Sequence, residues 1–465
     1  MTKEAVRTKQ SQPSNKVVPL AERLVQGKFI RNVVSRKDHA FWQPASDRFD
    51  PIDILEKSSE GRIPELIPIR YGRMMKSPFT FFRGSAAVMA ADLASTPVTG
   101  LKVQACGDCH LLNFGAFATP ERNLIVDIND FDETLPAFWE WDLKRLSTSF
   151  VLACRENGFA PETGIEAAQA VARSYREAMR EFAHMRVMDV WYSKLDLEGF
   201  LGHVSDKKMR EDIEACIERQ KEKSILEYMI PRLTVEENGR RRFKDAPPLL
   251  YHYEGKRFIQ IASETFEEYK NSLSHERQVL INRFELMDIA MKIVGIGSVG
   301  TYCSIMLLMA ADDDPLILQI KEARESVLEP YAGKSEFKNH GQRVVTGQRL
   351  MQAQSDIFLG WTVGTGKYHR HFYLRQLRDM KMTLTPEFWT PRRAVEVAEC
   401  LGWVLARAHA RSGDAAMISG YLGSKEVFDE ALGEFSVAYA DQAERDHLAL
   451  KDAIRSGRLD AQIER

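Results

Sequence analysis

The stretch from Val103 to Glu133 constrains the fold of this chain more than any other. It sets polar, metal-ligating side chains between short apolar segments: Asp108, His110, Asn113, Asp127, Asp130 and Asp132. A carboxylate at a buried strand costs free energy unless a cation or hydrogen-bond donors hold it. Magnesium bound together with phosphate oxygens is one such cation, because it needs only one or two protein ligands. The stretch therefore predicts a metal–phosphate centre between strands.

Length and composition predict a globular enzyme of several packed parts. A chain of 465 residues exceeds a single hydrophobic core. Its net charge of -2 gives no overall attraction to nucleic acid, so no nucleic-acid partner is expected. Six scattered cysteines do not form a disulfide framework, which predicts reduced thiols and a cytoplasmic location. The polar residues 2–16 are expected to be a disordered tail.

The apolar run from Ile293 to Ala311 is long enough for a membrane helix. Glycine and hydroxyl residues interrupt it, and no second span exists, so buried strands are favoured and no membrane insertion is expected. Its residues 295–300 fit the pattern G-x-G-x-x-G, which serves either a dinucleotide-binding turn or a kinase-type hairpin loop. The strand-like sequence that follows favours the hairpin.

The next strand-like run carries Lys321, as the phosphate-binding lysine does in kinases. The predicted nucleotide-binding residues are Gly295, Gly297, Ser298, Gly300 and Lys321. The ion-pair partner of Lys321 stays open between Glu325, nearest in sequence, and Gln348 or Gln352 on the following helix.

Asp108 and Asn113 have the spacing of the kinase catalytic loop H-R-D-x-x-x-x-N. Asp130-Phe131-Asp132 follows a predicted strand, as the metal-binding D-F-G does, with Asp132 in place of glycine. Asn113, Asp130 and Asp132 are therefore the predicted magnesium ligands, and Asp127 is a further possibility. The C-x-x-C formed by Cys106 and Cys109 lacks a second pair, which disfavours zinc or redox chemistry.

Helical periodicity predicts several helices. They cover Ser77–Ala94, Phe138–Ala153, Gly164–Met185, Asp206–Ser224, Pro391–Gly413 with Gly413 as C-cap, and Ser424–Arg455. Arg83, in the first of these, either forms a surface ion pair or contacts a phosphate or carboxylate at the site. Arg70 and Arg73 add positive charge just before it.

The motifs GDCHLLNFG, VDINDFDE and WDLKRL are similar to those of the aminoglycoside-phosphotransferase branch of the kinase-like superfamily. This resemblance implies a role for each matching residue. Asp108 would be the catalytic base, Asn113 and Asp130 the magnesium ligands, His110 structural, and Asp142 a brace of the loop. Together with FFRG, GIGSVGT, LQIKEA and AHARSGD, these motifs also resemble the bacterial family called domain of unknown function 2252, over most of residues 65–455.

The order of the motifs departs from that superfamily, since the glycine-rich run and Lys321 follow the catalytic loop. Cys106 also stands where the first histidine of the loop is expected. A circular permutation would explain the order, with the helices after Pro391 rejoining the first part of the chain. This hypothesis predicts that Lys321 and Asp130 face one cleft.

The expected fold is α+β: a two-lobed, protein-kinase-like fold, circularly permuted, with a large helical insert. Five parts are expected: a tail and irregular segment over 1–64, the catalytic and metal loops over 65–160, a helical insert over 161–290, a strand module with the glycine-rich loop over 291–385, and C-terminal helices over 386–465. The expected function is an ATP- and Mg²⁺-dependent phosphotransferase acting on a hydroxyl of a small molecule or protein. The alternatives are nucleotidyl transfer (AMPylation) on the same scaffold and non-catalytic nucleotide binding.

Overall fold

The computed structural model describes residues 18–203, 210–211, 230–253, 256–311, 314–365, 369–377, 382–383 and 385–463. The predicted tail and most of the predicted helix Asp206–Ser224 lie outside these residues. The described part combines helices with several antiparallel sheets, which confirms the α+β class. The kinase-like architecture and its permutation stay predictions.

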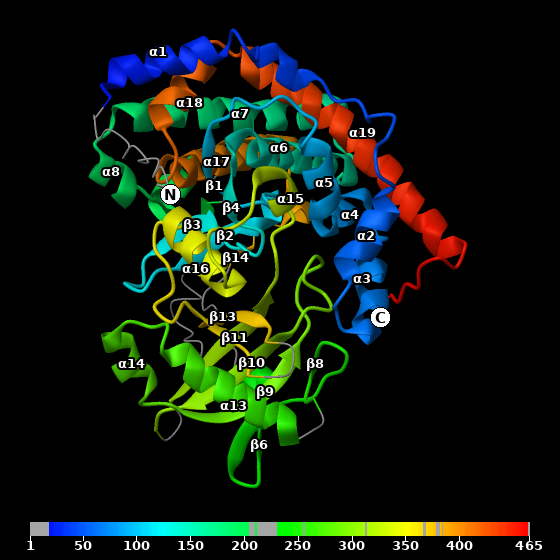
Figure 1. Ribbon diagram of the computed structural model, residues 1–465, viewed down its shortest axis with the longest axis vertical. Helices are drawn as coiled ribbons and strands as arrows, with labels where there is room; N and C mark the ends of the chain where they lie inside the picture. Colours follow the sequence, from blue (N-terminus) through cyan, green and yellow to red (C-terminus); the bar gives the residue numbers. More distant parts are fainter. Residues whose placement is uncertain are drawn as a thin grey trace, which may run out of the picture.

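A helical body lies at one end of the molecule (Figure 1). Its main helices are α1 (Leu20–Ile30), α6 (Trp139–Glu156), α7 (Pro161–His184), α17 (Pro391–Ala410), α18 (Ala415–Leu422) and α19 (Val427–Arg455). The amphipathic helix α7 packs against α6, α17, α18 and α19, because its apolar face needs cover on several sides. Helices from both ends of the chain therefore share one core, as the permutation hypothesis requires of the C-terminal helices.

Two short strand pairs carry the two acidic loops, residues 106–113 between β1 and β2 and residues 129–134 between β3 and β4. β1 (Lys102–Ala105) pairs with β4 (Leu135–Phe138), and β2 (Phe114–Ala118) pairs with β3 (Leu124–Ile128), both antiparallel. In these registers Ala105 lies opposite Leu135 and Phe114 opposite Ile128. The loop after β1 and the loop after β3 therefore emerge at the same end of the strands. β14 (Met382–Thr383) and β5 (Leu195–Asp196) extend the second pair to four strands.

A six-stranded antiparallel sheet lies at the other end of the molecule, with α13 (Lys256–Lys270) and α14 (His275–Ile281) beside it (Figure 1). Its order is β12 (Gly360–Val363), β13 (His371–Gln376), β11 (Pro315–Ala323), β10 (Cys303–Met309), β9 (Glu285–Lys292) and β8 (Leu250–Tyr251). The predicted hairpin around the glycine-rich loop, followed by the strand that carries Lys321, is confirmed by β9, β10 and β11. The sheet begins before residue 291, however, since β8 and β9 belong to it.

Shorter elements connect and cover these bodies. They are η1 (Arg36–Ala40), α2 (Pro51–Ser59), η2 (Pro64–Leu66), α3 (Ile67–Met74), α4 (Pro78–Gly84), α5 (Ala86–Leu93), η3 (Leu111–Asn113), α8 (Val187–Tyr192), α9 (Leu197–His203), α12 (Ile230–Leu233), β6 (Thr234–Glu237), β7 (Arg240–Phe243), α15 (Glu329–Ala332), α16 (His340–Met351) and η4 (Pro386–Phe388). Among the described residues, no helix combines the length and the apolar character needed to cross a membrane.

Two helix predictions were wrong in detail. The segment Ser77–Ala94 forms two helices, because the backbone leaves the helical conformation at Ser85 between α4 and α5. Gly413 is not a C-cap, since α17 ends at Ala410. Gly413 instead allows a close approach: a Cβ atom there would lie 2.5 Å from Val103 Cγ1.

A buried ion pair joins the first strands to the C-terminal helices. Asp127 on β3 accepts a hydrogen bond from Arg407 on α17, and both side chains are 1% exposed. The second carboxylate oxygen of Asp127 accepts 2.8 Å from the Ala353 amide, and Arg407 also donates to the Met351 carbonyl at 2.5 Å. Three distant segments therefore meet at one carboxylate.

We expect Asp127→Ala to lower the free energy of unfolding by about 3–5 kcal/mol, because it leaves the Arg407 cation buried without its counter-ion. Urea unfolding followed by circular dichroism measures this change. The matched control is Asp452→Ala, which removes an exposed partner of Arg455 and should change stability by less than about 0.5 kcal/mol. Equal effects of the two substitutions would contradict the structural role of Asp127.

Candidate active site

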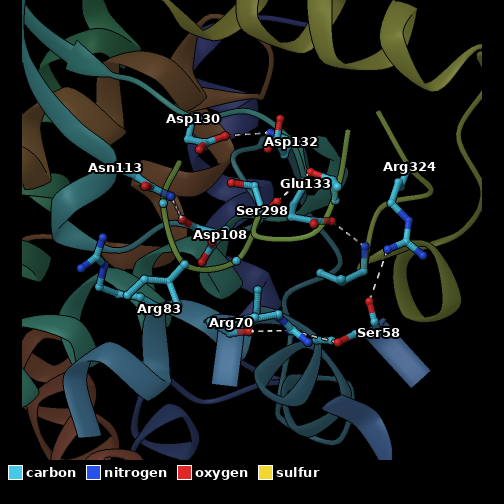
Figure 2. Close-up of a pocket in the computed structure, with 18 of the residues that line it drawn as sticks. Ser58, Arg70, Arg83, Asp108, Asn113, Asp130, Asp132, Glu133, Ser298 and Arg324 are labelled. Carbon is cyan, nitrogen blue, oxygen red and sulfur yellow. Dashed lines mark hydrogen bonds between the residues drawn. The ribbon is translucent and has the colours of Figure 1, made fainter. Parts of the chain in front are cut away.

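One cavity of about 240 Å³ lies where the acidic loops, the glycine-rich loop and the N-terminal helices meet. Most of the predicted site residues line it: Arg83, Asp108, His110, Asn113, Asp130, Asp132, Gly295, Gly297, Ser298 and Glu325. Figure 2 shows Asp130 and Asp132 at the top, Asp108 and Ser298 in the middle, Arg70 and Ser58 at the bottom, and Arg324 at the right, extending toward Ser58. Of the predicted glycines, Gly300 is not part of the lining.

Asp142, in the first turn of α6, binds the backbone of the first acidic loop. Its carboxylate accepts hydrogen bonds from the amides of Cys106 at 2.5 Å and Gly107 at 2.9 Å. A third contact comes from the buried His409 ring on α17, 3.2 Å away. Gly107 has a φ of +84° and lies so close to the Glu133 carbonyl that a side chain would not fit. The predicted bracing position of Asp142 is confirmed.

Asp108 forms an ion pair that the sequence analysis missed. Its Oδ1 accepts from Arg145 Nε at 2.8 Å and from Arg145 Nη2 at 2.5 Å. No described residue donates a hydrogen bond to its Oδ2. Burial raises the pKa of Asp108, and the nearby Arg145 opposes this effect. Arg145 lies three residues after Asp142 on α6, so one helix holds the loop through both residues.

Asn113 and His110 complete this loop. The Asn113 Nδ2 donates to the Asp108 carbonyl at 2.6 Å, which orients the amide and leaves Oδ1 as an available acceptor. His110 is 4% exposed and its Nδ1 has no hydrogen-bond partner among the described residues. Burial, together with Arg83 and Arg145, lowers its pKa well below the usual value, so the ring is neutral.

Lys321 reaches the second acidic loop from the six-stranded sheet. Its Nζ lies 2.6 Å from Asp132 Oδ2 and 3.8 Å from Asp130 Oδ1. The Tyr373 hydroxyl, on the neighbouring strand, donates 2.6 Å to Asp132 Oδ1. Burial alone would lower the pKa of Lys321, but Asp130 and Asp132 outweigh it and raise that pKa well above its usual value. The structure therefore places Lys321 next to Asp130, although Lys321 is not among the residues that line the cavity. That the two residues face one cleft stays a prediction.

The partners considered for Lys321 were wrong. Gln348 and Gln352 bond to each other, and Glu325 is an exposed residue of the cavity wall. Asp127 is also not available to a metal, since it is fully buried against Arg407 and does not line the cavity. α16, the helix that carries Gln348, has no acidic residue, and the loop after β3 supplies the counter-ion of Lys321 through Asp132 and Asp130.

The glycine-rich loop is fixed to the N-terminal helices through its carbonyl groups. Arg62 Nη1 donates to the carbonyls of Gly297 at 2.8 Å and Val299 at 2.6 Å, and Arg73 Nη1 donates to Gly295 at 2.5 Å. The Gly300 carbonyl accepts from the Ile63 amide at 2.7 Å. The loop therefore closes one wall of the cavity. Positive φ values at Gly295 and Gly300 allow its turns.

The comparisons with known proteins identify the family. The model of a family described as an uncharacterised protein conserved in bacteria, DUF2252, matches residues 62–453. This chain belongs to the DUF2252 family. No curated protein and no solved structure matches it. The family resemblance is therefore confirmed, and the resemblance to phosphotransferases stays a prediction for this DUF2252 protein.

The donor set of this DUF2252 protein fits magnesium only together with phosphate oxygens. Among the described residues, no group of three or more His, Cys, Asp or Glu side chains is arranged to hold a metal ion. Asn113 Oδ1 and the Asp130 carboxylate lie on the same side of the cavity (Figure 2). One amide and one carboxylate suffice for magnesium when a nucleotide supplies further oxygens.

Glu133, which was not predicted as a site residue, is a further acid of the cavity wall. Its Oε2 accepts 2.7 Å from the Val327 amide. Burial raises its pKa from 4.5 to about 7, with the Val327 amide and Arg343 opposing the shift. The folded protein therefore keeps a proton that the unfolded chain releases between these pH values.

We expect the free energy of unfolding to fall as the pH rises from about 4.5 to about 7, because the folded state binds the Glu133 proton more tightly. Glu133→Gln should remove this pH dependence. The free energy of unfolding of the variant, relative to that of the wild type, should therefore be higher at pH 8 than at pH 4.5 by on the order of 2 kcal/mol. Urea unfolding at the two pH values measures this difference. Glu325→Gln, an exposed acid of the same cavity, is the control, and an identical pH dependence in wild type and Glu133→Gln would disprove the assignment.

Proposed function

We propose that this protein is an ATP- and Mg²⁺-dependent phosphotransferase. The observation that supports this proposal is the contact of Lys321 with Asp130 and Asp132, two acids that line the cavity. Lys321 and Asp132 are 189 residues apart in the chain, since Lys321 lies on β11 and Asp132 in the loop after β3. A cation beside a pair of carboxylates, next to a glycine-rich loop, is the arrangement that phosphoryl transfer uses to hold phosphates and metal together.

Each residue then has a separate role. Lys321 and the amides of the glycine-rich loop would bind the nucleotide phosphates, and Asn113 and Asp130 would hold magnesium. The metal would neutralise charge on the transferred group. Asp132 would position Lys321, since it is the nearer of the two carboxylates. Asp142 and Arg145 would hold the catalytic loop through hydrogen bonds on either side of it.

Asp108 would act on the acceptor. Arg145 occupies Oδ1, so Oδ2 is the atom that can take the proton of an acceptor hydroxyl. The hydroxyl oxygen forms a bond to the γ-phosphorus of ATP, and the bond from that phosphorus to the β–γ bridging oxygen breaks. ADP leaves with that oxygen, and the proton goes to Asp108. Positioning and electrostatics do most of this work.

We expect Asp108→Asn to keep nucleotide affinity and to lower turnover by about 10²- to 10⁴-fold. Asn keeps an oxygen that can accept from Arg145, but it lacks the carboxylate that takes the proton. The measurement is an untargeted screen of small-molecule extracts for ATP-dependent mass gain, followed by rates with the acceptor found. Asp452→Asn, on the exposed face of α19, is the control. Turnover by Asp108→Asn at the wild-type rate would exclude the role of a base. A gain of adenylyl instead of phosphoryl mass would favour nucleotidyl transfer.

Asp130→Asn should instead weaken nucleotide binding in a magnesium-dependent way. Lys321 keeps its nearer partner Asp132 in this variant, so we expect it to fold. Isothermal titration with a non-hydrolysable ATP analogue, once with magnesium and once with EDTA, separates magnesium-dependent from magnesium-independent nucleotide binding. The affinity gain that magnesium gives the wild type should disappear in Asp130→Asn. The same gain in both proteins would show that Asp130 does not bind the metal.

A further inference from the structure

Three arginines gather around Ser58 in the cavity wall, on the opposite side of Asp108 from Asp130. Arg62 and Arg70 come from the N-terminal segment, and Arg324 comes from the end of β11. Figure 2 shows Arg70, Ser58 and Arg324 together at this side. None of the three has a role in the proposed phosphoryl transfer.

All three guanidinium groups bond only to neutral oxygens. Arg62 donates to the Ser58 carbonyl at 2.9 Å and to carbonyls of the glycine-rich loop. Arg70 donates to the hydroxyls of Ser59 at 2.7 Å and Ser58 at 3.0 Å, and to the Gly84 carbonyl at 3.1 Å. Arg324 donates to the carbonyls of Glu60 at 2.6 Å and Ser58 at 3.3 Å. Their charges are solvated by dipoles and not balanced by a carboxylate.

Among the described residues, no carboxylate lies within ion-pair distance of these three arginines. Two of the nearby acids have other partners: Glu322 pairs with Arg370, and Glu133 accepts from the Val327 amide. The exposed Glu325 of the same wall forms no ion pair with a described residue. By contrast, Arg145 of the same cavity pairs directly with Asp108. This side of the cavity therefore carries an unbalanced positive charge.

The three charges also repel one another. Burial lowers the pKa of Arg62 well below its usual value, Arg70 and Arg324 lower it further, and the more distant Glu133 and Glu322 only partly oppose this shift. The pKa of Arg70 falls to about 10, mainly through burial and also through Arg324. Arg70 is 2% exposed, and its Nε has no hydrogen-bond partner. Like charges held together in a poorly solvated wall are costly unless an anion joins them.

We propose that this cluster binds an anionic group, a phosphate ester or carboxylate, of the acceptor substrate. The proposal rests on the proposed phosphoryl transfer. The acceptor would lie across the cavity, with its anionic group at Arg62, Arg70 and Arg324 and its hydroxyl at Asp108. Guanidinium forks match both anions in shape and charge.

Binding of inorganic phosphate tests the cluster directly. We expect isothermal titration to show phosphate binding to the wild type, and Arg324→Gln to weaken it by about 10- to 100-fold, as for loss of a charged hydrogen bond. Arg324 makes only two carbonyl contacts, so this variant should fold, whereas Arg70 holds α2 against α4. Arg324→Lys should recover part of the affinity. The control is Arg458→Gln, which removes an exposed arginine that pairs with acids of α2.

A second titration distinguishes the acceptor from the nucleotide as the source of the anion. With the protein saturated by magnesium and a non-hydrolysable ATP analogue, phosphate should still bind with unchanged affinity. Displacement of phosphate by the analogue would assign the cluster to the nucleotide phosphates and overturn the proposal. Absence of phosphate binding to the wild type, or equal binding by Arg324→Gln, would overturn it as well. A protein that binds phosphate at the cluster but no nucleotide would instead disprove the phosphotransferase function.

Discussion

The contact of Lys321 with Asp132 and Asp130 is the interaction on which the rest of the site depends. The lysine is 2% exposed and would be costly to bury alone, and two carboxylates so close together would repel each other. Each charge therefore needs the other. Because Lys321 belongs to the six-stranded sheet and the acids belong to the loop after β3, this neutralisation also determines how the sheet docks on the rest of the molecule. Tyr373 adds a second hydrogen bond across the same junction.

The remaining walls of the cavity are held by arginine side chains that donate hydrogen bonds to backbone carbonyls. Arg343 on α16 donates to the carbonyls of Thr134 at 2.5 Å, Asp132 at 2.8 Å and Arg324 at 2.8 Å. Arg62 and Arg73 do the same for the glycine-rich loop. A guanidinium group has five donors in a rigid plane, so it can satisfy carbonyl groups that no strand or helix pairs. Irregular loops of this kind are thereby kept in place without regular secondary structure.

This mode of fixing loops has a consequence for charge. An arginine that bonds to carbonyls keeps its full positive charge, whereas one that bonds to a carboxylate is neutralised. The cavity contains both kinds: Arg145 is neutralised by Asp108, and Arg62, Arg70 and Arg324 are not. The result is a cavity with carboxylates on one side and unbalanced guanidinium groups on the other. Such a polarity is suited to a ligand that brings its own negative charge to the basic side.

Much of the site was predictable because it depends on local chain geometry. Asp108 and Asn113 lie in one loop between two strands, and Asp130 follows directly on β3, so spacing and strand patterns were enough to group them. The residues whose roles depend on tertiary contacts were missed for a common reason. Arg145, Glu133 and Arg62 resemble solvent-exposed charges when only their neighbours in sequence are known. The early start of the sheet at β8 and β9 was missed as well.

The sequence by itself determined the mixed α+β class, the two acidic loops, the hairpin strands around the glycine-rich loop, and the family. Only the tertiary structure decided which charges balance each other. It paired Lys321 with Asp132 instead of Glu325, and Asp127 with Arg407 instead of a metal. The physical reason is that secondary structure follows from interactions within a few residues of the chain. Electrostatic neutralisation in a buried site depends on distances between segments that may be hundreds of residues apart.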